Sequence, residues 1–219
     1  MHPQMAQETT DLTPSEPKES LIQRATDVFM RLGVRAVNMA DVSSELGISK
    51  KTLYKYVSDK RDLILQCMAW HCDQMEQVIE EAKFNSENTI DAELKLIRFI
   101  HRMTSEMHPS VLFDLSKYHP KAFRFVNERR DEILQGTMVE NIQRGQAEGL
   151  YREDVNPEVA TRFLISVSHA VKTMAENPAN KISLSQLYLQ SALYHIRAIA
   201  TPKGLAFLEE KIKAENLFS

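Results

Sequence analysis

The stretch that decides the fold is NMADVSSELGISKKTLYKYVSDKRDLI, residues 38–64. Its first half carries one apolar residue per helical turn, at Met39, Val42 and Leu46. This spacing predicts a short amphipathic helix that faces a core. Asn38 is suited to cap it, because its side-chain oxygen can accept from the free amides of the first turn. Gly47 tolerates left-handed backbone angles and therefore predicts the end of this helix and a tight turn.

The second half of the stretch predicts another short helix, capped by Ser49 and anchored inward by Leu53. Its remaining residues are hydrogen-bond donors, namely Lys50, Lys51, Thr52, Tyr54 and Lys55. Two helices joined at a steep angle by a short turn that contains glycine form a helix-turn-helix. In this motif the second helix enters the major groove of DNA, where lysines neutralise phosphates and hydroxyls bond phosphates or base edges.

A long helix is predicted to follow, capped by Asp59 and carrying Lys60 in its first turn. A cation there is poorly placed for the helix dipole, so a phosphate partner would explain it. A charged helix face is also, in many proteins, simply solvated. The residues predicted to bind DNA are Asn38, Ser49, Lys50, Lys51, Thr52, Tyr54, Lys55, Tyr56 and Lys60.

This stretch resembles the DNA-binding domain of the TetR family of bacterial transcriptional regulators. The family pattern is a capped helix, then G-hydrophobic-S, then x-x-T-hydrophobic-Y-x-aromatic-F, then a polar turn and K-x-x-L. The matching positions are Gly47, Ile48, Ser49, Thr52, Leu53, Tyr54, Tyr56, Lys60 and Leu63. Two positions depart from it: Asn38 stands where Thr or Ser is usual, and Val57 where Phe is usual. Asn caps as well as Thr, and Val keeps its site apolar, so the resemblance holds.

Charge is unevenly distributed along the chain of 219 residues. The net charge is −3, but residues 18–66 hold nine Lys and Arg against six Asp and Glu. The rest of the chain holds 18 basic and 24 acidic residues. A positive N-terminal part on a negative body is typical of a DNA-binding protein with a separate regulatory domain.

The remaining composition predicts a cytoplasmic protein that binds no metal or cofactor and does not enter a membrane. No run of about twenty apolar residues is present. Cys67 and Cys72 lie five residues apart on one predicted helix, a spacing that suits neither a disulfide framework nor a metal knuckle. The motifs of phosphate loops, zinc proteases and serine hydrolases are absent, so no enzyme is expected.

Apolar periodicity and helix-breaking residues predict about ten helices and no strand, an all-α protein. Residues 1–18 are expected to form a disordered tail, 19–64 a three-helix DNA-binding head, and 65–219 a helical regulatory and dimerisation body. The expected helices span 19–32, 39–46, 50 onward, 59–84, 91–107, 109–116, 121–148, 157–176, 183–200 and 203–214. The first would bury Leu21, Ala25, Val28, Phe29 and Leu32.

The resemblance implies that the body dimerises through its last two long helices, 157–176 and 183–200, and often encloses an apolar cavity. Their apolar faces comprise Phe163, Leu164, Val167, Val171, Leu187, Leu189, Leu193 and Ile196, some of which must be ordinary core. The cavity is expected between the helices that begin near 59, 91 and 121. Its candidate ligand-binding residues are Trp70, Phe99, His101, Met103, Met107, Phe113, Tyr118 and Phe123, although such side chains are more often core.

Together these patterns predict a homodimeric regulator that binds a palindromic operator in double-stranded DNA. As in most of the family, it would be a repressor released by a small hydrophobic effector. Two alternatives stay open. One is an architectural DNA-binding factor whose body binds protein partners, and the other is a helical ligand-binding protein that binds no DNA.

Overall fold

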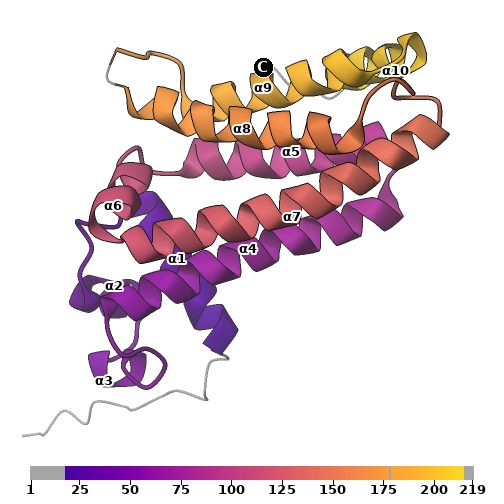
Figure 1. Ribbon diagram of the computed structural model, residues 1–219. Coiled ribbons are helices and arrows are strands. Elements are labelled where there is room, and N and C mark those ends of the chain that lie inside the picture. The colour runs from indigo at the N-terminus through magenta and orange to yellow at the C-terminus, as the bar shows by residue number, and fades with distance from the viewer. Residues whose placement is uncertain (1–17, 178, 215–219) are drawn as a thin grey trace, which may run out of the picture.

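The computed structural model describes residues 18–177 and 179–214, which form an all-helical protein (Figure 1). The predicted tail lies outside the described residues except for Lys18, which begins the first helix. The helices of the described part are α1 (Lys18–Leu32), α2 (Met39–Leu46), α3 (Lys50–Leu53), α4 (Lys60–Asn85), α5 (Thr89–Glu106), α6 (Val111–Tyr118), α7 (Pro120–Ala147), α8 (Pro157–Glu176), α9 (Leu184–Ile199) and α10 (Pro202–Ala214). No strand occurs in this part, where one isolated bridge joins Tyr151 to Ala200. The predicted all-α fold is confirmed.

Two predicted helices begin two residues away from their expected starts, and the others begin within one residue of theirs. α5 begins at Thr89 rather than near residue 91, because Asn88 is its cap and accepts a hydrogen bond from the Asp91 amide. α6 begins at Val111, two residues after the predicted start at Pro109. The Val111 amide donates to the His108 carbonyl, so the residues between them form a turn before the helix.

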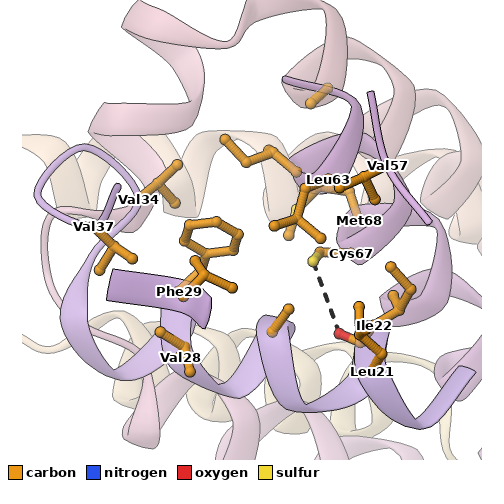
Figure 2. Close-up of a cluster of buried hydrophobic side chains, with 14 of the residues drawn as sticks. Leu21, Ile22, Val28, Phe29, Val34, Val37, Val57, Leu63, Cys67 and Met68 are labelled. Atoms are coloured by element: carbon orange, nitrogen blue, oxygen red, sulfur yellow. Dashed lines mark hydrogen bonds between the residues drawn. The ribbon is translucent and has the colours of Figure 1, made fainter. Parts of the chain in front are cut away.

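The head consists of α1, α2, α3 and the first turns of α4, packed around one core. Figure 2 shows its side chains converging, with Phe29 of α1 facing Leu63 of α4. The Cys67 thiol donates a hydrogen bond to the Ile22 carbonyl, 3.8 Å away, which ties α4 to α1. Leu32 was predicted to be buried and is exposed instead. Leu32 is the last residue of α1. After the turn at Gly33, Val34 rather than Leu32 places its side chain in the core.

The body is a layered bundle in which α4 and α7 lie side by side and α8 and α9 form the opposite layer (Figure 1). α5 is the central helix, since it packs against α4, α7, α9 and α10. Its Leu94 and Ile97 are buried.

Residues of the body also complete the core of the head. Val111 and Leu115 of α6 and Ala122 of α7 belong to the same buried cluster as α1–α4. α4 runs without a break through residues 64 and 65, where the sequence suggested a domain boundary. That boundary stays a prediction, and the packing joins head and body closely.

The corner between α7 and α8 is closed by Tyr151, whose ring lies directly over Gly145 of α7. A Cβ added at Gly145 would lie 2.2 Å from a ring carbon of Tyr151. The Tyr151 hydroxyl donates to Glu93 of α5 at 2.8 Å, and the Thr201 amide donates to the Leu150 carbonyl at 2.9 Å. The absence of a side chain at Gly145 therefore allows Tyr151 to join α5 and α7, while Leu150 beside it holds the connection between α9 and α10.

Gly145→Ala should lower the free energy of unfolding by about 1–3 kcal/mol, because the added methyl group has no space beside Tyr151. Gly136→Ala is the matched control in the same helix, since a Cβ there meets no atom within 4 Å. We expect it to raise the free energy of unfolding by up to about 1 kcal/mol. Urea unfolding at one fixed protein concentration measures both. Equal effects of the two substitutions would contradict the packing described.

Candidate functional site

Paired helix caps fix the direction of α3 relative to α2. Asn38 caps α2 in a capping box with Asp41, and Gly47 ends the helix with φ of 69°. Ser49, in an extended conformation, then caps α3 by accepting from the Thr52 amide at 3.0 Å. These contacts follow the predicted caps, so the turn between the helices is determined by local hydrogen bonds.

α3 is anchored by one side chain and exposes the others. Leu53 has no exposed surface and lies in the core of the head. Lys50, Lys51 and Lys55 are exposed, and 49% of the Tyr54 surface is accessible. α3 and the turn that follows it thus present three ammonium groups and a phenol hydroxyl to solvent.

Other residues predicted to bind DNA have partners within the head. The Asn38 side-chain oxygen accepts from the amides of Ala40 and Asp41 at 2.7 and 3.2 Å. The Ser49 and Thr52 hydroxyl oxygens lie 2.9 Å apart. Tyr56 is half-buried against the core of the head. In this structure Asn38, Ser49 and Tyr56 position α3, and the lysines and Tyr54 project from it.

Lys60, in the first turn of α4, has a partner on the neighbouring loop. Its Nζ donates to the Arg35 carbonyl at 3.4 Å. Desolvation lowers the pKa of Lys60, while the carboxylates of Asp114 and Asp41 oppose that shift. The unfavourable position of Lys60 at a helix N-terminus is therefore compensated in part within the protein.

A cavity of about 130 Å³ lies in the body among α4, α5, α7, α8 and α9. Three of these helices are those between which the sequence placed a pocket, and α8 and α9 complete the wall. The wall is mostly apolar, as Met75 of α4, Ile100 of α5 and Leu134 of α7 illustrate.

The structure brings two of the eight predicted ligand-binding residues, Phe99 and Met103, to this cavity. The other six do not line it. Trp70, Met107 and Phe123 pack against the core of the head. Phe113 and Tyr118 are exposed and meet edge to face, with ring centroids 6.3 Å apart. His101 is half-buried on α5, where its carbonyl accepts from the side chains of Thr104 and Ser105.

Several polar residues that the sequence did not single out line the cavity instead, namely His71, Glu93, Arg130, Ser168 and Tyr188. Burial raises the pKa of Glu93 to about 7, and the hydrogen bond from Tyr151 opposes this shift. Burial lowers the pKa of His71 to about 4, so its imidazole is neutral at physiological pH. One signal for Glu93 was available, because it lies three residues after Ile90 and one before Leu94 on the buried stripe of α5.

The two cysteines are free and buried. Burial raises the pKa of Cys67 to about 12 and that of Cys72 to about 11, so both thiols are protonated at neutral pH. Within the described ranges, no group of three or more His, Cys, Asp or Glu side chains is placed to hold a metal ion. Among the same residues, no helix combines the length and apolar character that crossing a bilayer requires.

Comparison with known proteins agrees with this geometry. Residues 21–67, which contain the whole helix-turn-helix, match the family described as bacterial regulatory proteins, tetR family. The HTH-type transcriptional repressor KstR2 of Mycolicibacterium smegmatis is 23% identical over 204 residues, which cover 88% of this chain and 96% of that protein. The HTH-type transcriptional activator FasR of the same organism is 30% identical over 71 residues, 32% of each chain.

The fold is shared beyond the head. The crystal structure of a transcriptional regulator from Cytophaga hutchinsonii aligns with a TM-score of 0.64 at 18% identity, over 84% of this chain and 98% of that one. The head matches by sequence and the helical body by structure. By its DNA-binding domain, residues 21–67, the chain matches the TetR family of transcriptional regulators, and its body shares their helical fold.

Proposed function

We propose that this protein is a homodimeric repressor that binds a palindromic operator and leaves it when a small apolar molecule occupies the body cavity. The observation that carries the proposal is α3, where Leu53 is locked into the core while three lysines and Tyr54 project outward. The similarity to a named repressor, KstR2, extends over nearly the whole chain and supports the direction of regulation. No catalytic step is part of the proposal.

The projecting side chains suit the two tasks of a DNA contact. Lys50, Lys51 and Lys55 neutralise phosphates and release counterions, which supplies affinity. The Tyr54 hydroxyl and the N-terminal residues of α3 reach phosphate oxygens or base edges when the helix enters the major groove. Asn38 and Ser49 contribute by holding α3 in place, and Lys60 bonds the loop that contains Arg35.

Dimerisation is assigned to an exposed apolar stripe on α8. Val159, Phe163, Val167, Ala170 and Met174 follow one another at helical spacing and are exposed. Five exposed side chains in line, four of them large apolar ones, suit the face of a partner, and a second copy of the chain would bury them symmetrically. The other predicted interface residues differ: Val171, Leu189, Leu193 and Ile196 are buried core, Leu164 lines the cavity, and Leu187 is half-buried.

Coupling between cavity and DNA is assigned to α4. Its middle lines the cavity through His71, Cys72 and Met75, and its N-terminal turns form part of the core of the head. A ligand that displaces the middle of α4 therefore changes the position of the head. Since both heads of a dimer must fit one duplex, a small displacement removes simultaneous binding.

The experiment that tests the proposal is sequencing of genomic fragments retained by the purified protein at physiological salt. We expect enrichment of a palindrome whose half-sites lie about 34 Å, or a multiple of that distance, apart, because a two-fold dimer presents two recognition helices. Enrichment without sequence preference would favour the architectural factor. Absence of any DNA binding would favour a helical ligand-binding protein and overturn the proposal.

Replacing Lys51 by alanine should weaken operator binding and reduce the slope of log K against log salt by about one unit, because one phosphate contact is lost. Lys213→Ala is the matched control, an exposed lysine on α10 at the end of the body away from the head (Figure 1). It should leave the slope unchanged. Fluorescence anisotropy with a labelled duplex over a range of salt measures both. Identical slopes for wild type and Lys51→Ala would contradict a phosphate contact.

Phe163→Glu should dissociate the dimer, because it places a charge in the middle of the apolar stripe. The side chain is 68% exposed in the isolated chain, so the substitution costs little within one protomer. Phe84→Glu is the control, since Phe84 is 82% exposed at the far end of α4. Sedimentation equilibrium should give half the wild-type mass for the first variant and the full mass for the second. A full mass for both would place the interface elsewhere.

A further inference from the structure

The body cavity combines an apolar wall with two polar groups that have no partner. Its volume of about 130 Å³ admits roughly ten groups of the size of a water molecule. In its wall, Arg130 Nε of α7 and Ser168 Oγ of α8 are buried and make no hydrogen bond within the described protein. Ser168 is only 8% exposed. Buried donors without a partner destabilise a fold, so two at one cavity point to a ligand that satisfies them.

The two donors belong to one connected group at the α7–α8–α9 side of the cavity. The Tyr188 side chain of α9 shares a hydrogen bond with Arg130, and its hydroxyl lies 3.5 Å from the Ser168 carbonyl. Arg130 and Ser168 therefore both meet Tyr188 at this side of the cavity.

The charge of Arg130 is already balanced by protein groups. Its Nη2 contacts Asp131 Oδ1 at 3.0 Å, and the other carboxylate oxygen of Asp131 lies 2.7 Å from His169 Nε2. The Nε–H remains directed to no acceptor. The site therefore offers hydrogen bonds without an excess positive charge.

A second carboxyl group, Glu93 of α5, also lines the cavity. It is buried, and its partner is the Tyr151 hydroxyl at 2.8 Å. No Lys, Arg or protonated His other than Arg130 is among the cavity-lining residues, because His71 is neutral. An anionic ligand would place its charge in a poorly solvated space that already holds a carboxyl group and no unbalanced cation, which is unfavourable.

We infer that the ligand of this cavity is an uncharged, mostly apolar molecule that bears a carbonyl oxygen, which accepts hydrogen bonds from Arg130 Nε and Ser168 Oγ. The inference rests on the proposed ligand-responsive regulation, to which it adds the chemical class of the effector. The apolar wall binds the hydrocarbon part of the molecule, and the two donors select for the oxygen.

The test compares three probes with one carbon frame: tetralin, its ketone tetralone, and tetralin carboxylic acid. Titration calorimetry of the full chain should show that tetralone binds more tightly than tetralin and that the acid binds more weakly than tetralone. Ser168→Ala should reduce the ratio of the tetralone and tetralin affinities roughly three- to tenfold, the effect of one lost hydrogen bond. Its affinity for tetralin should be unchanged.

Ser166→Ala is the matched control on the same helix. Ser166 is exposed outside the cavity, and its hydroxyl donates to the Arg162 carbonyl at 2.8 Å. This variant should keep the wild-type ratio. Without ligand, Ser168→Ala should melt at no lower temperature than wild type, because its hydroxyl has no partner to lose. A merely structural role for Ser168 would instead lower the melting temperature.

Three results would overturn the inference: an unchanged ratio in Ser168→Ala, tighter binding of the acid than of the ketone, or no binding of any probe to wild type. Duplex binding by the same samples separates this inference from the proposed function. A protein that binds its operator but none of the probes loses only the assigned ligand class. A protein that distinguishes ketone from hydrocarbon but binds no DNA overturns the regulator and keeps the ligand site.

Discussion

The burial of α4 along its whole length is the constraint on which the rest of the structure depends. Its first turns place Leu63, Cys67 and Met68 in the core of the head, and its later turns place Met75 and Ile79 in the core of the body. Both cores are closely packed, and packed interiors change between discrete arrangements rather than deforming continuously. Because one rigid helix belongs to both, a rearrangement in the body moves the head or disrupts its packing.

The cavity lies beside the middle of α4, so a ligand bound in it would contact the helix that both cores share. Its wall is built from five helices, and each of them contributes a polar side chain to it. Because Arg130 Nε and Ser168 Oγ lack hydrogen-bond partners, the fold is less stable than it would be with a fully apolar cavity wall. Such a cost is tolerated where the groups serve binding, and here a ligand would recover it.

Local chemistry made the head predictable from the sequence. Asn38, Gly47, Ser49 and Asp59 act through hydrogen bonds and backbone angles within a few residues, so their roles follow from position alone. The same holds for the helix that starts at Pro157. The start of α6 shows the limit of such prediction. Pro109 indicated roughly where the helix begins, but the hydrogen bond from the Val111 amide to the His108 carbonyl determines its first residue.

The cavity could not be predicted in the same way, because its lining depends on how helices rotate against each other. Aromatic side chains were the obvious candidates, yet Trp70 and Phe123 complete the core of the head, where body and head meet. The more informative signal was a polar residue within an apolar stripe. Arg130 stands four residues before Leu134, and Ser168 four after Leu164, so both share a face with residues of the interior. Which of these polar residues reach a cavity is decided only by the packing of all five helices.

The hydrogen bonds between α6 and the loop after α1 have a consequence for how such regulators diversify. The His108 amide donates to the Met30 carbonyl at 2.7 Å, and the Arg35 amide donates to Asp114 at 2.9 Å. Val111 and Leu115 add apolar contacts to the same joint. A head transplanted onto a foreign body would lose these partners and leave the Arg35 amide without its carboxylate acceptor. Recombination that exchanges recognition helices among relatives is therefore expected to carry α6 along, or to be confined to the few exposed side chains of α3.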